Sequence, residues 1–519
     1  MLNSDYPYPP PARAGAGTLP QRPAPQRPVS QRPVSQRPVS QRPVSTPGFR
    51  PVGQQRPNQY LAPGVKVAEE KADEHAGLRK MAFRAGLAML FVRLTVLPEL
   101  LYVWLQANTY LLYVVGPPAI LGALVTGAIG RTYQDRAARM WTGFFVCMIL
   151  SLPGSTWAGG SFEDLKLYTL FAFPLLFVVG GLTTEWSAVR SLVSLVGFSG
   201  ICFIGAAAVL AKPDVEGRLT MGDTTTTVGN SNDLASHVIL LLPFILFIAM
   251  DKKRNSFVRY SMLLPIAYGA RIVLATGSRG ALIALAAMFL FVLFRGSAKQ
   301  RMITMAATGL LAIAIPILVS GGAADRLATL FGAESANATL NQEAGESRDS
   351  REYLLRQSLI FTMEHPLLGV GMGQFSNYEG GHAVAAGQVG NWHETHNAFT
   401  EVSSECGVPA LIFFVLGIGY AYGSVSKVYK KAKLAGHVEI TNAAFCYLLA
   451  MTGYVVTIVF LSNAYRFYLP AMIGVAIALR AAADIELAAP VPASPLPQPV
   501  RRGAGWNGQP FPLQQRRLT

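Results

Sequence analysis

Two histidines in one polar stretch have a type and spacing that point to chemistry. In NWHETHNAFTEVSSECG, residues 391–407, His393 and His396 are three residues apart, and polar side chains follow at helical spacing. A zinc site would need a third ligand at a suitable distance, and HETH is one residue shorter than the catalytic HExxH pattern. A general base is the favoured interpretation, because the ordinary histidine pKa is about 6.5. A structural histidine at the start of a helix is the alternative.

Arg279, in TGSRGALIAL, stands where a short turn enters an apolar segment. A guanidinium placed next to the membrane is costly unless something anionic uses it. Arginine keeps its charge and offers phosphate a bidentate fork, so the functional interpretation is a diphosphate ligand. The alternative is an interfacial arginine whose head extends into water.

The stretch ESRDSREYLLRQSLIFTMEHPLLGVGMGQF, residues 346–375, contains further candidates for an anion site. Arg348, Arg351 and Arg356 lie on an expected amphipathic helix that ends at Pro366. The glycines that follow predict a tight turn with an accessible backbone. As a phosphate loop the turn is a weak match, because no lysine follows it.

Polar residues at two other places are weaker candidates. GNSNDLASHVILLLPF, residues 229–244, puts Asn232 and Asp233 at the start of an apolar segment, where Asn and Asp are good helix caps. Arg93 lies inside the first apolar segment and Glu99 follows it. Charges in a membrane segment predict function by default, although these two can also neutralise each other.

The composition predicts an all-α polytopic membrane protein. Of the 519 residues 51% are hydrophobic and 14% are charged, and the mean hydropathy is +0.33. Soluble domains carry about 25% charged residues. Apolar runs of about 17–25 residues, the length that crosses a bilayer, repeat from 84 to 482. About twelve transmembrane helices are expected, at 84–105, 109–129, 140–153, 165–184, 190–211, 233–250, 258–276, 280–297, 302–320, 405–424, 441–461 and 466–482.

The connectors between these segments predict the orientation. Four are strongly basic, at 131–139, 251–259, 295–301 and 427–433, and cytoplasmic loops are enriched in Lys and Arg. With both termini in the cytoplasm, all four fall on the cytoplasmic side. The net charge of +15 is therefore explained by membrane topology, which places basic residues on the cytoplasmic side, and a nucleic-acid partner is not expected. One large extracytoplasmic loop, about 321–403, is expected to hold helices and a working surface of its own.

The two ends of the chain differ in character from this core. Residues 1–65 form a Pro- and Arg-rich tail with QRPVS repeats, and such a composition predicts disorder. Residues 66–83 are expected to form a membrane-surface helix, 84–482 the transmembrane core, and 483–519 a second disordered Pro-rich tail. The repeats are also a candidate docking segment for a cytoplasmic partner or anionic lipid.

Several motifs, in order, resemble those of the O-antigen ligase / O-antigen polymerase family of bacterial surface-polysaccharide enzymes. They are SLPGSTWAGGS (151–161), GNSNDLA, TGSRGA, the segment with an arginine fifteen residues before a proline, and HNAFTEVSSECGVPAL. The resemblance covers 84–482 and neither tail. It selects Arg279, Arg351 and His396 as the family's key residues. The chain departs from the pattern at Leu355, where an aromatic is common, and at Pro409–Ala410, where a glycine is common.

The resemblance implies a metal-independent, inverting glycosyltransferase that needs no cofactor. Its donor is an undecaprenyl-diphosphate-linked glycan at the periplasmic face of the inner membrane. His396 would take the acceptor proton and Arg279 and Arg351 would bind the diphosphate. Supporting candidates are Asn397, Glu405, Asn232, Arg348 and Arg356. Ligase and polymerase activity share these motifs, so the acceptor is either lipid A–core or another lipid-linked glycan, in lipopolysaccharide or exopolysaccharide biosynthesis. A third member of the class would transfer the glycan to protein.

Two other classes remain as alternatives. A multi-pass transporter or flippase of lipid-linked or anionic substrates would also carry many helices and outer arginines. Two matching halves with broken helices near the midplane, which many transporters show, are not evident in the sequence. A scaffold whose QRPVS array recruits assembly factors is the second alternative, and it is compatible with catalysis.

Overall fold

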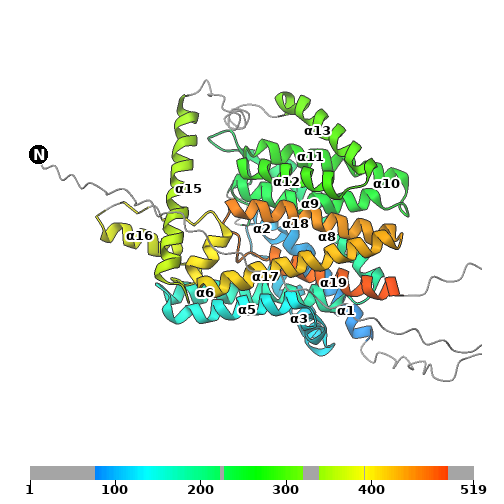
Figure 1. Cartoon of the computed structure of the whole chain (residues 1–519), viewed down its shortest axis with the longest axis horizontal. Coiled ribbons are helices and arrows are strands. Elements are labelled where there is room, and N and C mark those ends of the chain that lie inside the picture. The colour runs from blue at the N-terminus through cyan, green and yellow to red at the C-terminus, as the bar shows by residue number, and fades with distance from the viewer. Residues whose placement is uncertain (1–75, 223–226, 319–337, 388, 391, 489–519) are drawn as a thin grey trace, which may run out of the picture. The chain divides into compact units, whose positions relative to one another are not determined.

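The computed structural model describes residues 76–222, 227–318, 338–387, 389–390 and 392–488 (Figure 1). The side chains of 314–318 and 338–348 are not described, and the QRPVS repeats and the tail from 489 lie outside the described residues. Of the expected surface helix at 66–83, only 76–83 is described, and it runs on without a break into the first long helix.

The described elements are almost all helices, and they belong to one compact unit, Glu70–Thr519. They are α1 (Ala76–Leu94), α2 (Leu97–Leu105), α3 (Leu111–Val125), α4 (Ala128–Tyr133), α5 (Arg136–Ser151), η1 (Leu152–Gly154), α6 (Ala158–Phe171), α7 (Phe173–Leu182), α8 (Trp186–Leu210), β1 (Lys212–Pro213), β2 (Leu219–Thr220), α9 (Ser231–Met250), α10 (Ser256–Ser261), α11 (Leu263–Ala275), α12 (Arg279–Arg295), α13 (Ala298–Leu318), α15 (Ala338–Glu364), α16 (Phe375–Ala385), α17 (Ala398–Leu434), α18 (Val438–Thr457), η4 (Ile458–Phe460) and α19 (Tyr468–Ala488). The strands β1 and β2 pair antiparallel.

Seven stretches of helix in the described residues are long and apolar enough to cross a membrane, so the protein is a helical membrane protein. They are Arg136–Gly154, Ala158–Leu182, Trp186–Leu210, Ser231–Met250, Ser256–Ala275, Ala398–Leu434 and Val438–Phe460. The pair α1 and α2 makes an eighth if it counts as one span. The expected number of about twelve is not confirmed.

The first expected span, 84–105, is not one continuous helix. α1 and α2 are bent by 64° at Thr95–Val96, where Val96 has a φ of 54°. Pro98 lies in the first turn of α2, where a proline is tolerated because its missing amide hydrogen would have no partner within the helix. The break leaves Arg93 and Glu99 on the two sides of a bend.

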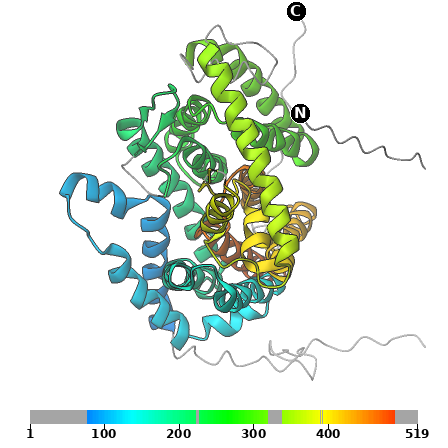
Figure 2. The same ribbon diagram turned by 90° about the vertical axis from the view of Figure 1, so that its left-hand side faces the viewer.

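The long helices run side by side, and α15 crosses their ends (Figures 1 and 2). α17 packs against α5 and α18, while α9 packs against α8 and α18. At the contact of α5 with α17, the rings of Trp141, Phe144 and Phe414 lie 5.1–5.5 Å apart between centroids. Gly417 makes room for Trp141, since a Cβ there would lie 2.9 Å from its ring. Small residues at helix contacts permit such close approach inside a membrane.

The four basic connectors gather at one end of this bundle. Asp135, at the start of α5, is paired with Arg480 of α19, and Lys431 of α17 is paired with Asp484, one turn from Arg480. Arg295 donates a hydrogen bond to Ser426 at 3.1 Å, which joins the end of α12 to the same region.

The connector at 251–259 belongs to this end too. Arg190, at the start of α8, is paired with Asp251 and Glu439, which joins the connector to the start of α18. The basic connectors therefore share one side, as the charge pattern predicts, and which side of the membrane that is remains a prediction.

The opposite end is shaped by a kink in α17. Gly407 has φ 85° and ψ 170°, so the helix is interrupted there. The amide of Val408 donates instead to the carbonyl of Pro366 at 2.8 Å, and Pro366 lies in the segment that follows α15. A Cβ on Gly407 would lie 2.3 Å from the carbonyl oxygen of Leu367. Glycine at this position lets the two backbones meet.

We expect Gly407→Ala to destabilise the protein by about 1–3 kcal/mol, because both the backbone conformation and the space disfavour a Cβ. Gly419→Ala is the matched control on the same helix, since a Cβ there would meet nothing within 4 Å. Unfolding in detergent or lipid measures both variants. Equal melting temperatures for the two would contradict the described kink.

Candidate functional site at the α17 end of the bundle

Two buried carboxylates on consecutive turns of α17 hold the loops on either side of them. Glu405 accepts hydrogen bonds from the amides of Gly373 at 2.8 Å and Phe375 at 3.0 Å. Glu401, one turn earlier, accepts from the amide of Ala464 at 3.1 Å. Because an unpaired polar group is costly in an apolar interior, each carboxylate fixes the loop that satisfies it.

The glycine-rich turn after Pro366 is a packing device. Gly369, Gly371 and Gly373 all have positive φ, and a Cβ on any of them would lie 2.1–2.2 Å from a neighbouring atom. The amides of Val370 and Gly371 donate to carbonyls of α17. The amides of Val370, Gly371 and Gly373 are therefore committed to α17, which explains the glycines without a bound phosphate.

The SLPGSTWAGGS motif supports the same turn from its other side. Thr156 donates from its amide to the carbonyl of Val370 at 2.9 Å. The hydroxyl of Ser161 donates to the carbonyl of Met372 at 2.7 Å. Two motifs more than 200 residues apart in sequence thus form one supporting layer.

The second loop, 461–467, joins η4 to α19 and carries the polar residues of the site. Asn463 donates to Asp233 at 3.2 Å, which ties the loop to the start of α9. The hydroxyl of Ser462 accepts from the amide of His396 at 2.9 Å and lies 3.2 Å from that of Thr395. The stretch before α17 is therefore held against this loop.

His396 sits in a restrained conformation just before α17. Its φ is 52°, a value that is uncommon outside glycine and that clusters at functional sites. Burial, with smaller contributions from the charges of Arg351 and His393, lowers the pKa of His396 to about 4. The imidazole is therefore neutral at physiological pH and able to accept a proton. Because the charge of Arg351 contributes to the lowered pKa of His396, Arg351 of α15 lies near His396.

α15 is held in place by contacts with its neighbours. The hydroxyls of Thr362 and Ser403 are 2.8 Å apart, which joins α15 to α17. Tyr353 donates to Glu379 of α16 at 3.1 Å. These contacts orient the helix that carries Arg351.

Arg279 is the first residue of α12, behind the capping residue Ser278. The next residue, Gly280, packs on Phe460 of η4, where a Cβ would lie 2.9 Å from the ring. Arg279 therefore enters the bundle beside the loop that holds His396. Arg218 also approaches here, because it donates to the carbonyl of Thr276 at 3.1 Å and to Asn232 at 3.2 Å.

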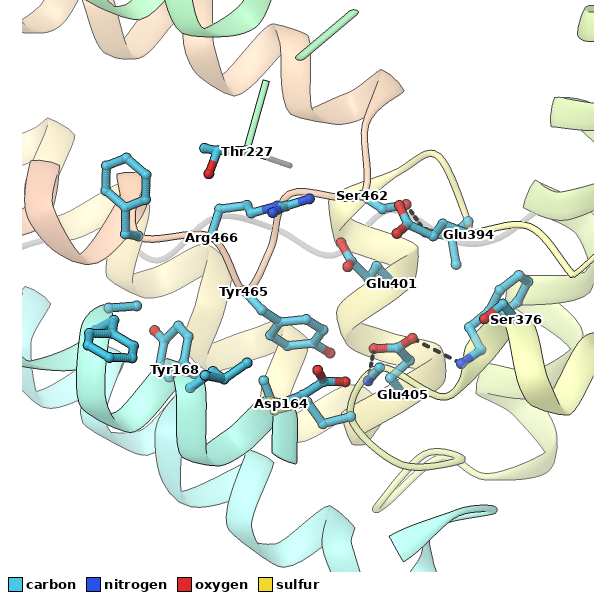
Figure 3. A pocket seen from close by; sticks show the side chains of 18 of the residues that line it. Asp164, Tyr168, Thr227, Ser376, Glu394, Glu401, Glu405, Ser462, Tyr465 and Arg466 are labelled. Carbon is cyan, nitrogen blue, oxygen red and sulfur yellow. Dashed lines mark hydrogen bonds between the residues drawn. The ribbon is translucent and has the colours of Figure 1, made fainter. Parts of the chain in front are cut away.

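A cavity of about 480 Å³ opens next to these residues and is called the polar cavity below (Figure 3). Figure 3 shows Arg466 extending toward Glu394 and Ser462, with Glu401 beneath it. The cavity is lined by Arg93, Glu99, Asp164, Leu167, Tyr168, Phe171, Ala172, Thr227, Met372, Gly373, Phe375, Ser376, Glu394, Thr395, Glu401, Glu405, Ser462, Tyr465, Arg466 and Phe467.

The three principal candidates from the sequence come from different elements. His396 is held by Ser462 of the loop 461–467, the charge of Arg351 acts on His396, and Arg279 precedes the glycine that packs on Phe460. The polar cavity has none of the three in its lining, although it includes Thr395 and Ser462. Asn397 caps α17 through the amides of Phe399 and Thr400.

The supporting candidates are spread more widely. Glu405 supports the glycine turn, and Asn232 accepts from Arg218. Arg356 is exposed on α15, while the side chain of Arg348 lies outside the described residues.

The sequence interpretation missed several polar residues that line the cavity. Arg466 is the main one, and its electrostatic partners include Asp233, Glu394 and Glu401. The signal was present, because Arg466 in SNAYRFY is an arginine at the start of an apolar segment, the feature that drew attention to Arg279. Glu401 is one of the polar residues that follow His396 at helical spacing, and Glu394 gave no signal of its own.

The bend between α1 and α2 gives the weaker pair from the sequence a place in the same cavity. Arg93 lies over the rings of Phe171 and Phe467, at 5.6 and 4.9 Å from their centroids. Glu99 accepts from the amide and the hydroxyl of Thr227. The two charges therefore have separate partners within one cavity.

The fold and the site together define a helical membrane protein with a buried polar site at one end of its bundle. Residues 264–415 match the model of the family described as O-Antigen ligase. This match confirms the family resemblance over residues 264–415, a segment that includes Arg279, Arg351 and His396. The match and the apolar helices place the protein in membrane-bound polysaccharide biosynthesis. No curated protein matches the chain.

We expect Glu405→Gln to lower the free energy of unfolding by about 1–3 kcal/mol, because one buried amide loses its acceptor. The matched control is Glu364→Gln, since Glu364 is exposed at the end of α15. Thermal unfolding of the two variants in the same lipid measures the difference. A Glu405→Gln variant as stable as the control would contradict the role given to this carboxylate.

Proposed function

We propose that the protein transfers a glycan from a polyprenyl diphosphate to an acceptor hydroxyl. The observation that carries the proposal is a neutral histidine with one arginine acting on its charge and a second arginine entering near the loop that holds it. His396 is held there by Ser462, the charge of Arg351 acts on it, and Arg279 enters beside Phe460. The match to the O-Antigen ligase family, over a segment that contains all three, supports the same reaction.

In this reaction the acceptor oxygen attacks the anomeric carbon of the donor sugar. The new glycosidic bond forms as the bond from that carbon to the diphosphate oxygen breaks, and the polyprenyl diphosphate leaves with the electron pair. Attack from the face opposite the leaving group inverts the anomeric configuration. His396 accepts the proton of the acceptor hydroxyl.

The two arginines act on the leaving group. Arg279 and Arg351 bind the diphosphate and stabilise the charge that develops as the sugar bond breaks. Fixed cations in a partly dehydrated site do this far better than cations in bulk water. With charge supplied by arginines, the reaction is proposed to be independent of a metal ion.

The acceptor is one of two kinds. A second lipid-linked glycan would make the protein a polymerase, and a lipid A–core would make it a ligase. The basic connectors lie at the other end of the bundle from His396. By the distribution of positive charge, the site is proposed to face the periplasm and the termini the cytoplasm of a bacterial inner membrane.

The experiment supplies purified protein in lipid with an undecaprenyl-diphosphate oligosaccharide, in EDTA, and offers the two acceptors separately. Longer glycan chains would identify a polymerase, and a glycosylated lipid A–core a ligase. His396→Ala is expected to lose about 10²- to 10⁴-fold in rate, as for removal of a general base. Arg279→Ala and Arg351→Ala are each expected to lose about 10²-fold or more.

Matched variants keep this result specific. His382→Ala removes an exposed histidine of α16, and Arg356→Ala removes an exposed arginine of the helix that carries Arg351. Both are expected to retain activity within about threefold, the ordinary range for a surface change. Product from neither acceptor, or equal rates for the site variants and these controls, would overturn the proposal and favour a transporter.

The pH dependence gives a second test. Because the pKa of His396 is lowered to about 4, the base is neutral above that pH and activity falls as pH drops through about 4. Removing a nearby positive charge makes protonation easier. In Arg351→Gln the residual kcat/KM should therefore begin to fall, as the pH is lowered, at a higher pH than in wild type. In Arg356→Gln it should fall at the same pH as in wild type. A wild-type limb near the ordinary value of about 6.5 would contradict a buried base.

A further inference from the structure

The polar cavity has the size and the walls of a small-molecule site. Its volume of about 480 Å³ falls within the range of roughly 300–1,000 Å³ that is typical of ligand sites. Aromatic side chains line it together with carboxylates, arginines and hydroxyls, and Tyr465 lies between the upper and lower polar groups in Figure 3. Flat apolar rings beside dense hydrogen-bonding groups suit a ligand with both apolar faces and many hydroxyls.

The charge of the cavity argues against a diphosphate inside it. Five carboxylates and two arginines line the wall: Glu99, Asp164, Glu394, Glu401 and Glu405, with Arg93 and Arg466. The carboxyl groups outnumber the arginines, so this wall offers a diphosphate less attraction than a site built mainly of cations. Sugars without phosphate gain from the same groups, because carboxylates accept hydrogen bonds from hydroxyls.

The carboxylate of Asp164 is available to a ligand at the wall. Asp164 is exposed on α6 and lines the cavity. Its carboxylate lies against Gly373, where only a glycine leaves room for it. The Nε of Arg93, by contrast, is fully buried, so this atom does not itself face the cavity.

We propose that the polar cavity binds the acceptor sugar, as a hydroxyl-rich glycan unit without phosphate; this inference rests on the proposed transfer reaction. The cavity wall includes Thr395 and Ser462. His396 directly follows Thr395 in the sequence, and its amide donates a hydrogen bond to Ser462. A sugar in the cavity therefore presents a hydroxyl toward the base. The donor diphosphate stays with Arg279 and Arg351, which the cavity lining does not include.

The placement fits the balance of the reaction. The acceptor hydroxyl gives its proton to His396 and its oxygen forms the bond to the anomeric carbon. The diphosphate leaves on the other side of that carbon. A carboxylate-rich cavity on the acceptor side and arginines on the leaving-group side keep the two substrates apart by charge, which is how a site rejects the wrong ligand in each place.

The test measures binding without turnover, using the full chain in lipid nanodiscs. One probe is the oligosaccharide that mild acid releases from the lipid-linked donor, and the second is a deacylated core oligosaccharide. A third probe, undecaprenyl diphosphate, reports on the anion site. Saturation-transfer NMR detects the glycans, and a competition assay measures the diphosphate.

Asp164→Ala should weaken binding of the glycan that wild type binds by about tenfold, the effect of one or two lost hydrogen bonds. Ser376→Phe, which puts a ring into the cavity from α16, should weaken it as well. Glu163→Ala is the matched control, because Glu163 neighbours Asp164 on α6 but is paired with Lys166 outside the cavity. All three variants should bind undecaprenyl diphosphate as wild type does.

The possible outcomes distinguish a failure of the cavity inference from a failure of the proposed transfer reaction. Glycan binding that is unchanged in Asp164→Ala and Ser376→Phe, or absent in wild type for both glycans, would overturn the inference. Loss of diphosphate binding in the same variants would overturn it as well, because the cavity would then hold the donor. Glycan binding lost in the variants, in a protein that transfers nothing, would support the cavity and count against the transfer reaction alone.

Discussion

The site depends on how α17 begins. Glu401 and Glu405 lie on successive turns, and each is buried and satisfied by backbone amides of a different loop. If either loop moved, a buried carboxylate and its amide donors would lose their partners together. In an apolar interior this is expensive enough to keep both loops in one arrangement. The positions of the glycine turn and of Ser462, and through Ser462 that of His396, follow from this one constraint.

A second consequence is the separation of charge at this end of the bundle. The positive groups Arg279 and Arg351 come from the start of α12 and from α15, whereas the carboxylates come mainly from α17 and its neighbours. In the proposed reaction, this arrangement would draw an anionic leaving group and a neutral acceptor to different places. Because the interior around them is apolar, the distinction is stronger than the same charges would create in water.

Much of this follows from the sequence, and the reasons differ between elements. Apolar runs and basic connectors predict a helical membrane protein, because a bilayer imposes segment length and charge bias on any sequence. Arg279 and His396 are proposed from the sequence because a charge or a histidine at a membrane boundary is unusual. Glu401 is noticed only as one of several polar residues at helical spacing, and Arg466 is missed, since their roles depend on which loops meet them in three dimensions. The kink at Gly407 is likewise set by contacts with a distant segment, at Pro366 and Leu367.

Measuring how much free lipid carrier the protein releases tests the proposed glycosyl transfer most directly. Mass spectrometry can count the free undecaprenyl diphosphate formed for each glycan joined to an acceptor, in wild type and in His396→Ala. Glycosyl transfer predicts one free carrier for each new glycosidic bond, and almost none in the variant. Glycan that crosses the membrane or changes partner while still attached to its carrier would contradict the account and identify the protein as a transporter.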